Sequence, residues 1–208
     1  MIDIDAVRLC AAIYDPETPW ASLWKGTDPD GIYAAVSANY LVFRGSVTGA
    51  DWARDFRANP IMHPKLGGVE FGFMEGIDEF ANKVVPSLGD NPIVCGHSLG
   101  AARAVLFGAL LAANGKPPAA IVAFGCPKPG FLRLSEILAP VSIRSYKNRF
   151  DPVTDVPLTF YPDLPYIQPR AQIQLDVKPA PDDFGFFADH HVNLYVEGVE
   201  QCNGEKAQ

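Results

Sequence analysis

A serine flanked by two glycines, GHSLG at residues 96–100, is the pattern in this sequence that most directly indicates chemistry. The apolar run NPIVCGH leads into it, and good helix formers follow from Leu99 to Ala113. Glycines at both ends of the turn let a strand and a helix approach closely while the serine backbone adopts a strained conformation. The Ser98 hydroxyl would then project from the end of a strand, where a nucleophile can reach its substrate. The Leu99 amide, in the first helical turn, would point at the reacting carbonyl.

The same five letters can also mark an ordinary loop serine between turn glycines. Here the strand-like run before Ser98 and the helix-like run after it favour the nucleophile. His97 is the nearest histidine in the chain, but adjacent residues on a sharp turn diverge. We therefore expect His97 to pack beneath the turn and not to act as the base.

A serine hydroxyl becomes an effective nucleophile when a histidine accepts its proton and a carboxylate orients that histidine. Only His190 and His191 follow Ser98 in the chain, and apolar spacing does not decide between them. Asp151, directly after the strand-like run VSIRSYKN, is the candidate carboxylate, and Asp155 is the fallback. Either aspartate could instead be a turn former beside a proline. The order serine, aspartate, histidine is that of the α/β-hydrolases.

Strand-like and helix-like segments alternate along much of the chain, which indicates a sheet covered by helices. The sequence predicts an α/β fold, with a central, mostly parallel sheet flanked by helices, in one domain spanning residues 1–208. Trp20 and Trp24 are expected in an N-terminal loop. The expected strands lie within 31–39, 40–46, 91–97, 119–125, 141–148 and 171–177, and the expected helices within 1–15, 74–88, 99–113, 131–138 and 192–199.

The order of these segments resembles that of the class 3 lipases, which are fungal-lipase-like α/β-hydrolases. The similar segments are YLVFRGS (40–46) for the strand and oxyanion segment, GHSLG for the nucleophile, AFGCPKPG (123–130) for a strand and turn, NRFDPVTDVP (148–157) for the acid and DHHVNLY (189–195) for the histidine. The resemblance implies the α/β-hydrolase fold and hydrolysis of carboxylic esters through an acyl-enzyme, with no metal or organic cofactor.

The resemblance also favours one of the two histidines. Related chains often have Asp-His, four residues and then Tyr, a spacing that puts His190 in register with Tyr195. The site residues that the resemblance implies are Ser98 as nucleophile, Asp151 as acid, His190 as base, and the Leu99 amide with the Ser46 amide and hydroxyl as the oxyanion hole.

One segment departs from the family. Members that act on aggregated lipid usually carry an amphipathic lid helix after the oxyanion segment, but ARDFRANPIMHPKLGG at 53–68 is short and contains two prolines. We expect no large lid here, and Michaelis kinetics on soluble short-chain esters. Phe56, Ile61 and Met62 could form a small flap or an ordinary packed loop.

The composition limits partners and location. Apolar residues make up 48% of the chain without a run of the length that a bilayer needs, so we expect a soluble protein with no transmembrane segment. A net charge of −7 disfavours nucleic acid and strongly anionic membranes and favours a small-molecule or lipid ester of little charge. The acidic N-terminus indicates a cytoplasmic protein, or one exported without a recognisable signal peptide.

Four cysteines without metal-ligand spacing indicate reduced, structural thiols, with a Cys10–Cys202 disulfide as the alternative in an exported protein. Two other functions are consistent with the fold. One is an acyl hydrolase for a non-lipid ester, such as a phenolic or metabolite ester, and the other is a binding protein without turnover. An apparently complete Ser-Asp-His set argues against the binding protein. Nothing in the sequence indicates the oligomeric state.

Overall fold

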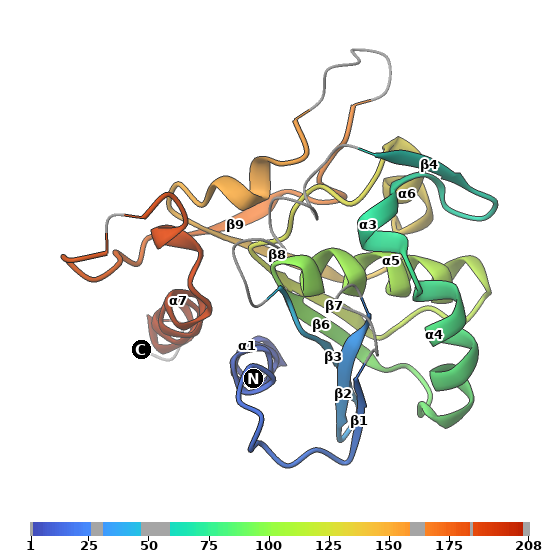
Figure 1. The fold of residues 1–208 in the computed structure, drawn as a ribbon, viewed down its shortest axis with the longest axis horizontal. Helices are drawn as coiled ribbons and strands as arrows, with labels where there is room; N and C mark the ends of the chain where they lie inside the picture. The colour runs from blue at the N-terminus through green and yellow to red at the C-terminus, as the bar shows by residue number, and fades with distance from the viewer. Residues whose placement is uncertain (1, 26–30, 47–58, 159–164, 184, 206–208) are drawn as a thin grey trace.

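The computed structural model describes residues 2–25, 31–46, 59–158, 165–183 and 185–205. A seven-stranded sheet runs through it in the order β1-β2-β3-β6-β7-β8-β9 (Figure 1). The first two pairings are antiparallel and the other four are parallel, so the predicted mostly parallel sheet is confirmed. The strands are β1 (Ser22–Lys25), β2 (Tyr33–Ser37), β3 (Tyr40–Phe43), β6 (Ile93–His97), β7 (Ala120–Phe124), β8 (Ile143–Asn148) and β9 (Gln172–Leu175).

Helices cover both faces of the sheet, as predicted (Figure 1). Successive strand residues point to opposite faces, so Val94 packs on one helical layer while Cys95 packs on the other. Two apolar clusters result, one on each side of the sheet. The first layer consists of α1 (Ile2–Ala12) and α7 (Val192–Glu205), and the second of α3 (Phe71–Met74), α4 (Ile77–Val84), α5 (Leu99–Ala113) and α6 (Leu132–Ile137).

Helix α5 is the most enclosed of these helices. Every residue from Leu99 to Leu111 is buried, because the sheet lies on one side of the helix and α3, α4 and α6 pack on the others. An apolar sequence around the whole helix suits such an environment. Since α5 begins directly after Ser98, this burial fixes the position of the serine relative to the sheet.

The predicted helix at 74–88 is interrupted. The range holds the last residue of α3, then α4 and the 3₁₀ turn η1 (Val85–Ser87). The helical conformation is interrupted at Gly76, whose φ is +74°. An unpredicted hairpin of β4 (Pro60–His63) and β5 (Gly67–Glu70) precedes α3. Of the three residues named for a small flap or a packed loop, Ile61 and Met62 lie in β4, while Phe56 lies outside the described residues.

The remaining differences are small. Trp24 lies in β1 and not in a loop, and α7 continues six residues beyond the expected helix to Glu205. All four cysteines are free, as predicted, and Cys10 and Cys202 on α1 and α7 are not bonded to each other. Within the described ranges, no helix is long and apolar enough to cross a membrane.

Candidate active site

Ser98 lies at the carboxyl end of β6, in the tight turn that joins this central strand to α5. Its φ of 61° and ψ of −131° form a combination that residues with a β-carbon rarely adopt. The Ser98 amide donates to the Phe124 carbonyl at 2.9 Å, and the Ser98 carbonyl accepts from the amides of Ala101 and Ala102. Bonds to the neighbouring strand and to the following helix therefore hold the serine in this conformation.

The two glycines of the turn allow the close approach that the sequence predicts. A β-carbon on Gly96 would lie 2.2 Å from the Gly100 carbonyl oxygen, and one on Gly100 would lie 2.2 Å from the Phe43 carbonyl oxygen. Both separations are far inside van der Waals contact. Any larger residue at either position would push α5 away from β6 and β3.

The Ser98 hydroxyl is buried and, among the described residues, its oxygen has no hydrogen-bond partner. A buried polar atom of this kind is uncommon and is often found where chemistry occurs. Gly125, at the end of the adjacent strand β7, marks what lies nearby. A β-carbon there would be 2.7 Å from Cε1 of His190 and 3.0 Å from Oδ2 of Asp151. These two side chains therefore meet at the same edge of the sheet as Ser98.

Asp151 and His190 form a buried pair. Nδ1 of His190 lies 2.6 Å from Oδ2 of Asp151, and the two side chains are 4% and 0% exposed. Oδ1 of Asp151 accepts from the Val153 amide at 2.9 Å, so the aspartate also caps the 3₁₀ turn η2 (Pro152–Asp155). Because Nδ1 faces the carboxylate, Nε2 is the ring nitrogen that can accept a proton.

Tyr195, in the first turns of α7, completes the coordination of this carboxylate. Its hydroxyl donates to Oδ2 of Asp151 and accepts from the Asn148 amide at 3.2 Å. Burial and then the Asp151 charge raise the pKa of Tyr195 well above its ordinary value, so the phenol keeps its proton. Apolar spacing alone gives Tyr195 only a packing role, and its five-residue offset from His190 is the sequence signal for this contact.

Asn148 is a further residue that sequence reasoning missed. It is fully buried at the end of β8, and its Nδ2 donates to the carbonyls of Val177 at 2.9 Å and Asp189 at 3.2 Å. Its Oδ1 accepts from the Val177 amide at 3.0 Å. One side chain thus joins three segments and holds the residue before His190. Nothing in the local sequence distinguishes this asparagine from a turn former.

Leu99 and Ser46 lie beside the serine turn. Leu99 is the first residue of α5, where the amide has no acceptor within the helix. Ser46 follows β3 and is half-buried. A β-carbon on the preceding Gly45 would be 3.0 Å from Cβ of Ser98, so the chain reaches Ser46 directly beside the turn.

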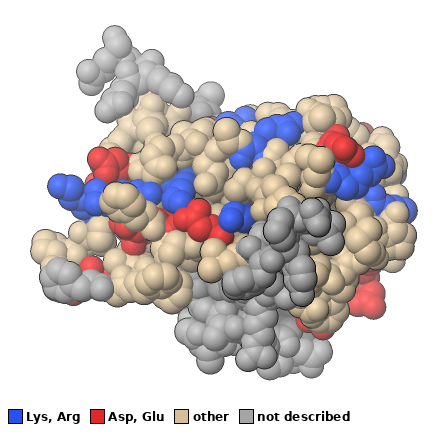
Figure 2. Space-filling view, turned by 90° about the horizontal axis from the view of Figure 1, so that it is seen from above, with Lys and Arg blue, Asp and Glu red and all other residues tan. Residues whose placement is uncertain are grey.

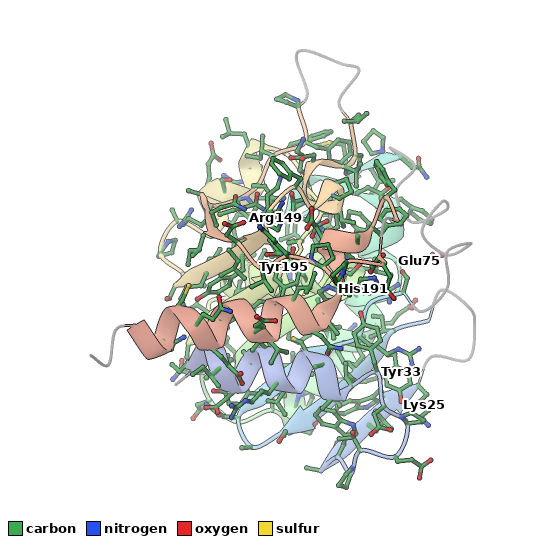
Figure 3. All side chains as sticks on the ribbon, turned by 90° about the vertical axis from the view of Figure 1, so that its left-hand side faces the viewer. Lys25, Tyr33, Glu75, Arg149, His191 and Tyr195 are labelled. Carbon is green, nitrogen blue, oxygen red and sulfur yellow. The ribbon has the colours of Figure 1, made fainter. Side chains whose placement is uncertain are left out.

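The alternative acid and base lie apart from this cluster. His191 pairs with Asp183 at 2.9 Å, and its side chain is 63% exposed. Figure 3 shows His191 near the start of α7, in front of the sheet, with Tyr195 further along the same helix. Asp155 pairs with Lys147 at 2.9 Å and is also largely exposed. His97 is buried, as expected, and its Nε2 lies 2.9 Å from the His190 carbonyl oxygen.

Comparison with known sequences assigns a family. Residues 40–161 match the family described as Lipase (class 3). A lipase from Rhizomucor miehei is 35% identical over 77 residues, which cover 32% of this chain and 21% of that protein. The match to this curated relative thus spans about a fifth of its length.

Solved structures show the same fold. The nonglycosylated LIP2 lipase of Yarrowia lipolytica is 21% identical with a TM-score of 0.60, covering 86% of this chain and 72% of its own. The triacylglyceride lipase of Rhizomucor miehei is 20% identical with a TM-score of 0.62, covering 85% of this chain and 76% of its own. These similarities confirm the α/β-hydrolase fold. Because the family match covers more than half of this chain, the chain belongs to the class 3 lipase family.

Proposed function

We propose that the chain hydrolyses carboxylic esters through an acyl-enzyme formed on Ser98. The observation that carries this proposal is the meeting of a buried serine in a strained turn with the buried Asp151–His190 pair at one edge of the sheet. Serine, histidine and aspartate in this arrangement perform acyl transfer on unrelated folds, and membership of a lipase family supports the same reaction class.

In this reaction Nε2 of His190 takes the Ser98 proton as the serine oxygen attacks the ester carbonyl. Asp151 orients the imidazole through Nδ1 and stabilises the imidazolium that forms. The amides of Leu99 and Ser46, with the Ser46 hydroxyl, bind the oxyanion. His190 then gives its proton to the leaving alcohol, and a water activated by the same nitrogen releases the acid. No step needs a metal or an organic cofactor.

The proposed substrate is a neutral ester with an apolar acyl group, from a lipid or a small molecule. Exposed aromatic residues adjoin the acid and the base in the chain, because Phe150 precedes Asp151 while Phe186 and Phe187 precede His190. Phe150 and Phe186 are 79% and 76% exposed, which favours contact with apolar groups. Figure 2 shows acidic and basic side chains mixed on one face with uncharged surface beside them, so that face offers no field of a single sign.

The test combines covalent labelling with a substrate series. A fluorophosphonate should label wild-type protein at Ser98, and p-nitrophenyl esters of increasing acyl length should be cleaved with Michaelis kinetics, also in the presence of a chelator. A triglyceride emulsion serves as the comparison, and we expect no jump in rate when an ester passes its solubility limit. Such a jump would indicate a functional lid. An ester of a phenolic acid belongs in the same series, and its cleavage without cleavage of the aliphatic acyl esters would favour the non-lipid hydrolase. A protein that neither labels nor turns over would be a binding protein.

A further inference from the structure

A buried chain of hydrogen bonds runs behind the serine turn, through two side chains that the proposed reaction does not use. The Tyr14 hydroxyl, just beyond α1, lies 3.0 Å from Nδ1 of His97. Nε2 of His97 lies 2.9 Å from the backbone carbonyl of His190. Both atoms of the His97 ring that can form hydrogen bonds are therefore engaged.

The chemistry of the groups fixes the direction of each bond. A carbonyl oxygen only accepts, so Nε2 of His97 carries the proton and donates to His190. A neutral imidazole then accepts at Nδ1, which makes the Tyr14 hydroxyl the donor. Burial, and next the charge of His190, lower the pKa of His97 well below its usual value, and burial raises that of Tyr14. Both shifts favour the neutral forms that this pattern requires.

At its Tyr14 end, this series of hydrogen bonds contacts the segment before Ser46. The Gly45 backbone lies directly against the Tyr14 oxygen. A β-carbon on Gly45 would lie 2.4 Å from that oxygen and 2.7 Å from the His97 carbonyl oxygen, so only glycine fits here. The Tyr14 hydroxyl thus contacts both the oxyanion segment and the residue directly before Ser98.

From these contacts we propose that Tyr14 and His97 are positioning residues that hold the His190 backbone and the Gly45–Ser46 segment in register with Ser98. The inference rests on the proposed ester hydrolysis. Three parts of the site come from distant segments, and Tyr14 and His97 join all of them through two hydrogen bonds and the close contact with Gly45. The His97 and His190 rings have centroids 4.5 Å apart, so a neutral His97 also avoids repelling His190 when it becomes an imidazolium.

The decisive variant is Tyr14→Phe, with Tyr146→Phe as its matched control. The Tyr146 hydroxyl donates to Asp3 in the first turn of α1 at 3.0 Å, whereas Tyr14 lies beyond the last turn of that helix and bonds to His97. Each variant removes a tyrosine hydroxyl that is hydrogen-bonded inside the protein, so both should lower the unfolding temperature. Only Tyr14→Phe should also lower kcat, by about tenfold with KM nearly unchanged, because misplaced reacting groups slow the chemical step.

Two further measurements examine His97. In nitrogen-15 NMR, the wild-type ring should be the neutral tautomer protonated at Nε2 at neutral pH, and it should stay neutral as the pH falls through the ordinary range of histidine. His97→Gln, which keeps an N–H that can donate to the His190 carbonyl, should retain more turnover than His97→Leu, which has none.

The inference is wrong if Tyr14→Phe and Tyr146→Phe have equal kcat on an ester that wild type cleaves, or if the His97 proton lies on Nδ1. Wild-type protein that cleaves no ester would instead refute the proposed function, and the positioning role with it. The two failures are distinguishable because wild-type turnover is measured in the same assay.

Discussion

The two halves of the site are built differently. The nucleophile half is one continuous segment from Ile93 to Ala113, in which strand, turn and helix follow each other directly. The acid-base half joins Asp151 to His190 and Tyr195, which are 39 and 44 residues away along the chain. Backbone hydrogen bonds hold the first half, whereas side-chain hydrogen bonds hold the second.

This difference indicates how each half should respond to substitution. The Ser98 side chain has no partner among the described residues, so its loss should change the chemistry and leave the fold intact. Asp151 is the buried hydrogen-bond partner of both His190 and Tyr195, and removing any of the three takes a partner from buried polar atoms. Substitutions in the acid-base half should therefore reduce stability as well as turnover.

Ser98→Ala should have the largest effect on turnover. Loss of a nucleophile typically lowers kcat by about 10⁵- to 10⁶-fold, and fluorophosphonate labelling should disappear. Ser145→Ala is the matched control, because Ser145 is also a buried serine in the sheet, with no hydrogen-bond partner for its hydroxyl in the described part of the chain. Both variants should unfold at nearly the wild-type temperature. Substantial turnover in Ser98→Ala would remove the serine from the mechanism.

His190→Ala should come close to this loss of turnover and should also lower stability, by about 1–3 kcal/mol, because the buried Asp151 loses one of its partners. His191→Ala is the control. It removes an exposed side chain that pairs with Asp183, and most of the activity should remain. Steady-state kinetics on one soluble ester and urea unfolding would measure both effects. The reverse ranking would transfer the base to His191.

Asp151→Asn should lower kcat by about 10⁴-fold, since the amide no longer stabilises the imidazolium and can impose the wrong tautomer on His190. Asp155→Asn removes the other candidate acid, which is exposed and pairs with Lys147. That variant should keep nearly full turnover. Comparable losses in both variants would show that the segment matters as a turn and not through one carboxylate.

The same contrast explains what could be predicted from the sequence. The determinants of the serine turn are neighbours in the chain, so GHSLG between a strand and a helix is sufficient to find it. The pairing of Asp151 with His190 depended on family order, because their contact exists only in the folded chain. Tyr14 and Asn148 gave no sequence signal, since ordinary residues acquire their roles there from buried tertiary contacts.

Errors in the fold have a similar cause. β1 is only four residues long, and its strand character depends on antiparallel pairing with β2, which the local sequence of Trp24 does not reveal. The hairpin of β4 and β5 likewise depends on partner strands. The long helix α5 was predictable because its apolar content persists over several turns, whereas the last six residues of α7, which are mostly polar, gave no such signal.

Ser46→Ala tests the proposed oxyanion hole, to which Ser46 contributes from a third segment, after β3. If the hydroxyl donates mainly to the developing charge, its loss should lower kcat by about a hundredfold and change KM much less. Ser37→Ala, in β2 of the same sheet, is the control and should have wild-type kinetics. A small change in kcat would mean that the Ser46 amide alone is sufficient.

Tyr195→Phe should have the smallest effect, because the carboxylate keeps its bonds to His190 and to the Val153 amide. We expect kcat to fall by about five- to tenfold and stability by about 1–3 kcal/mol, since both Asp151 and the Asn148 amide lose a partner. Burial and the Asp151 charge raise the pKa of Tyr195 well above its ordinary value, so the phenol keeps its proton and its bond to the carboxylate throughout the neutral range. The ratio of wild-type to variant kcat/KM should therefore stay constant between about pH 6 and pH 9. A ratio that falls towards one as the pH rises would show that the tyrosine loses its proton in this range, and would contradict the buried hydrogen bond on which the acid-base half depends.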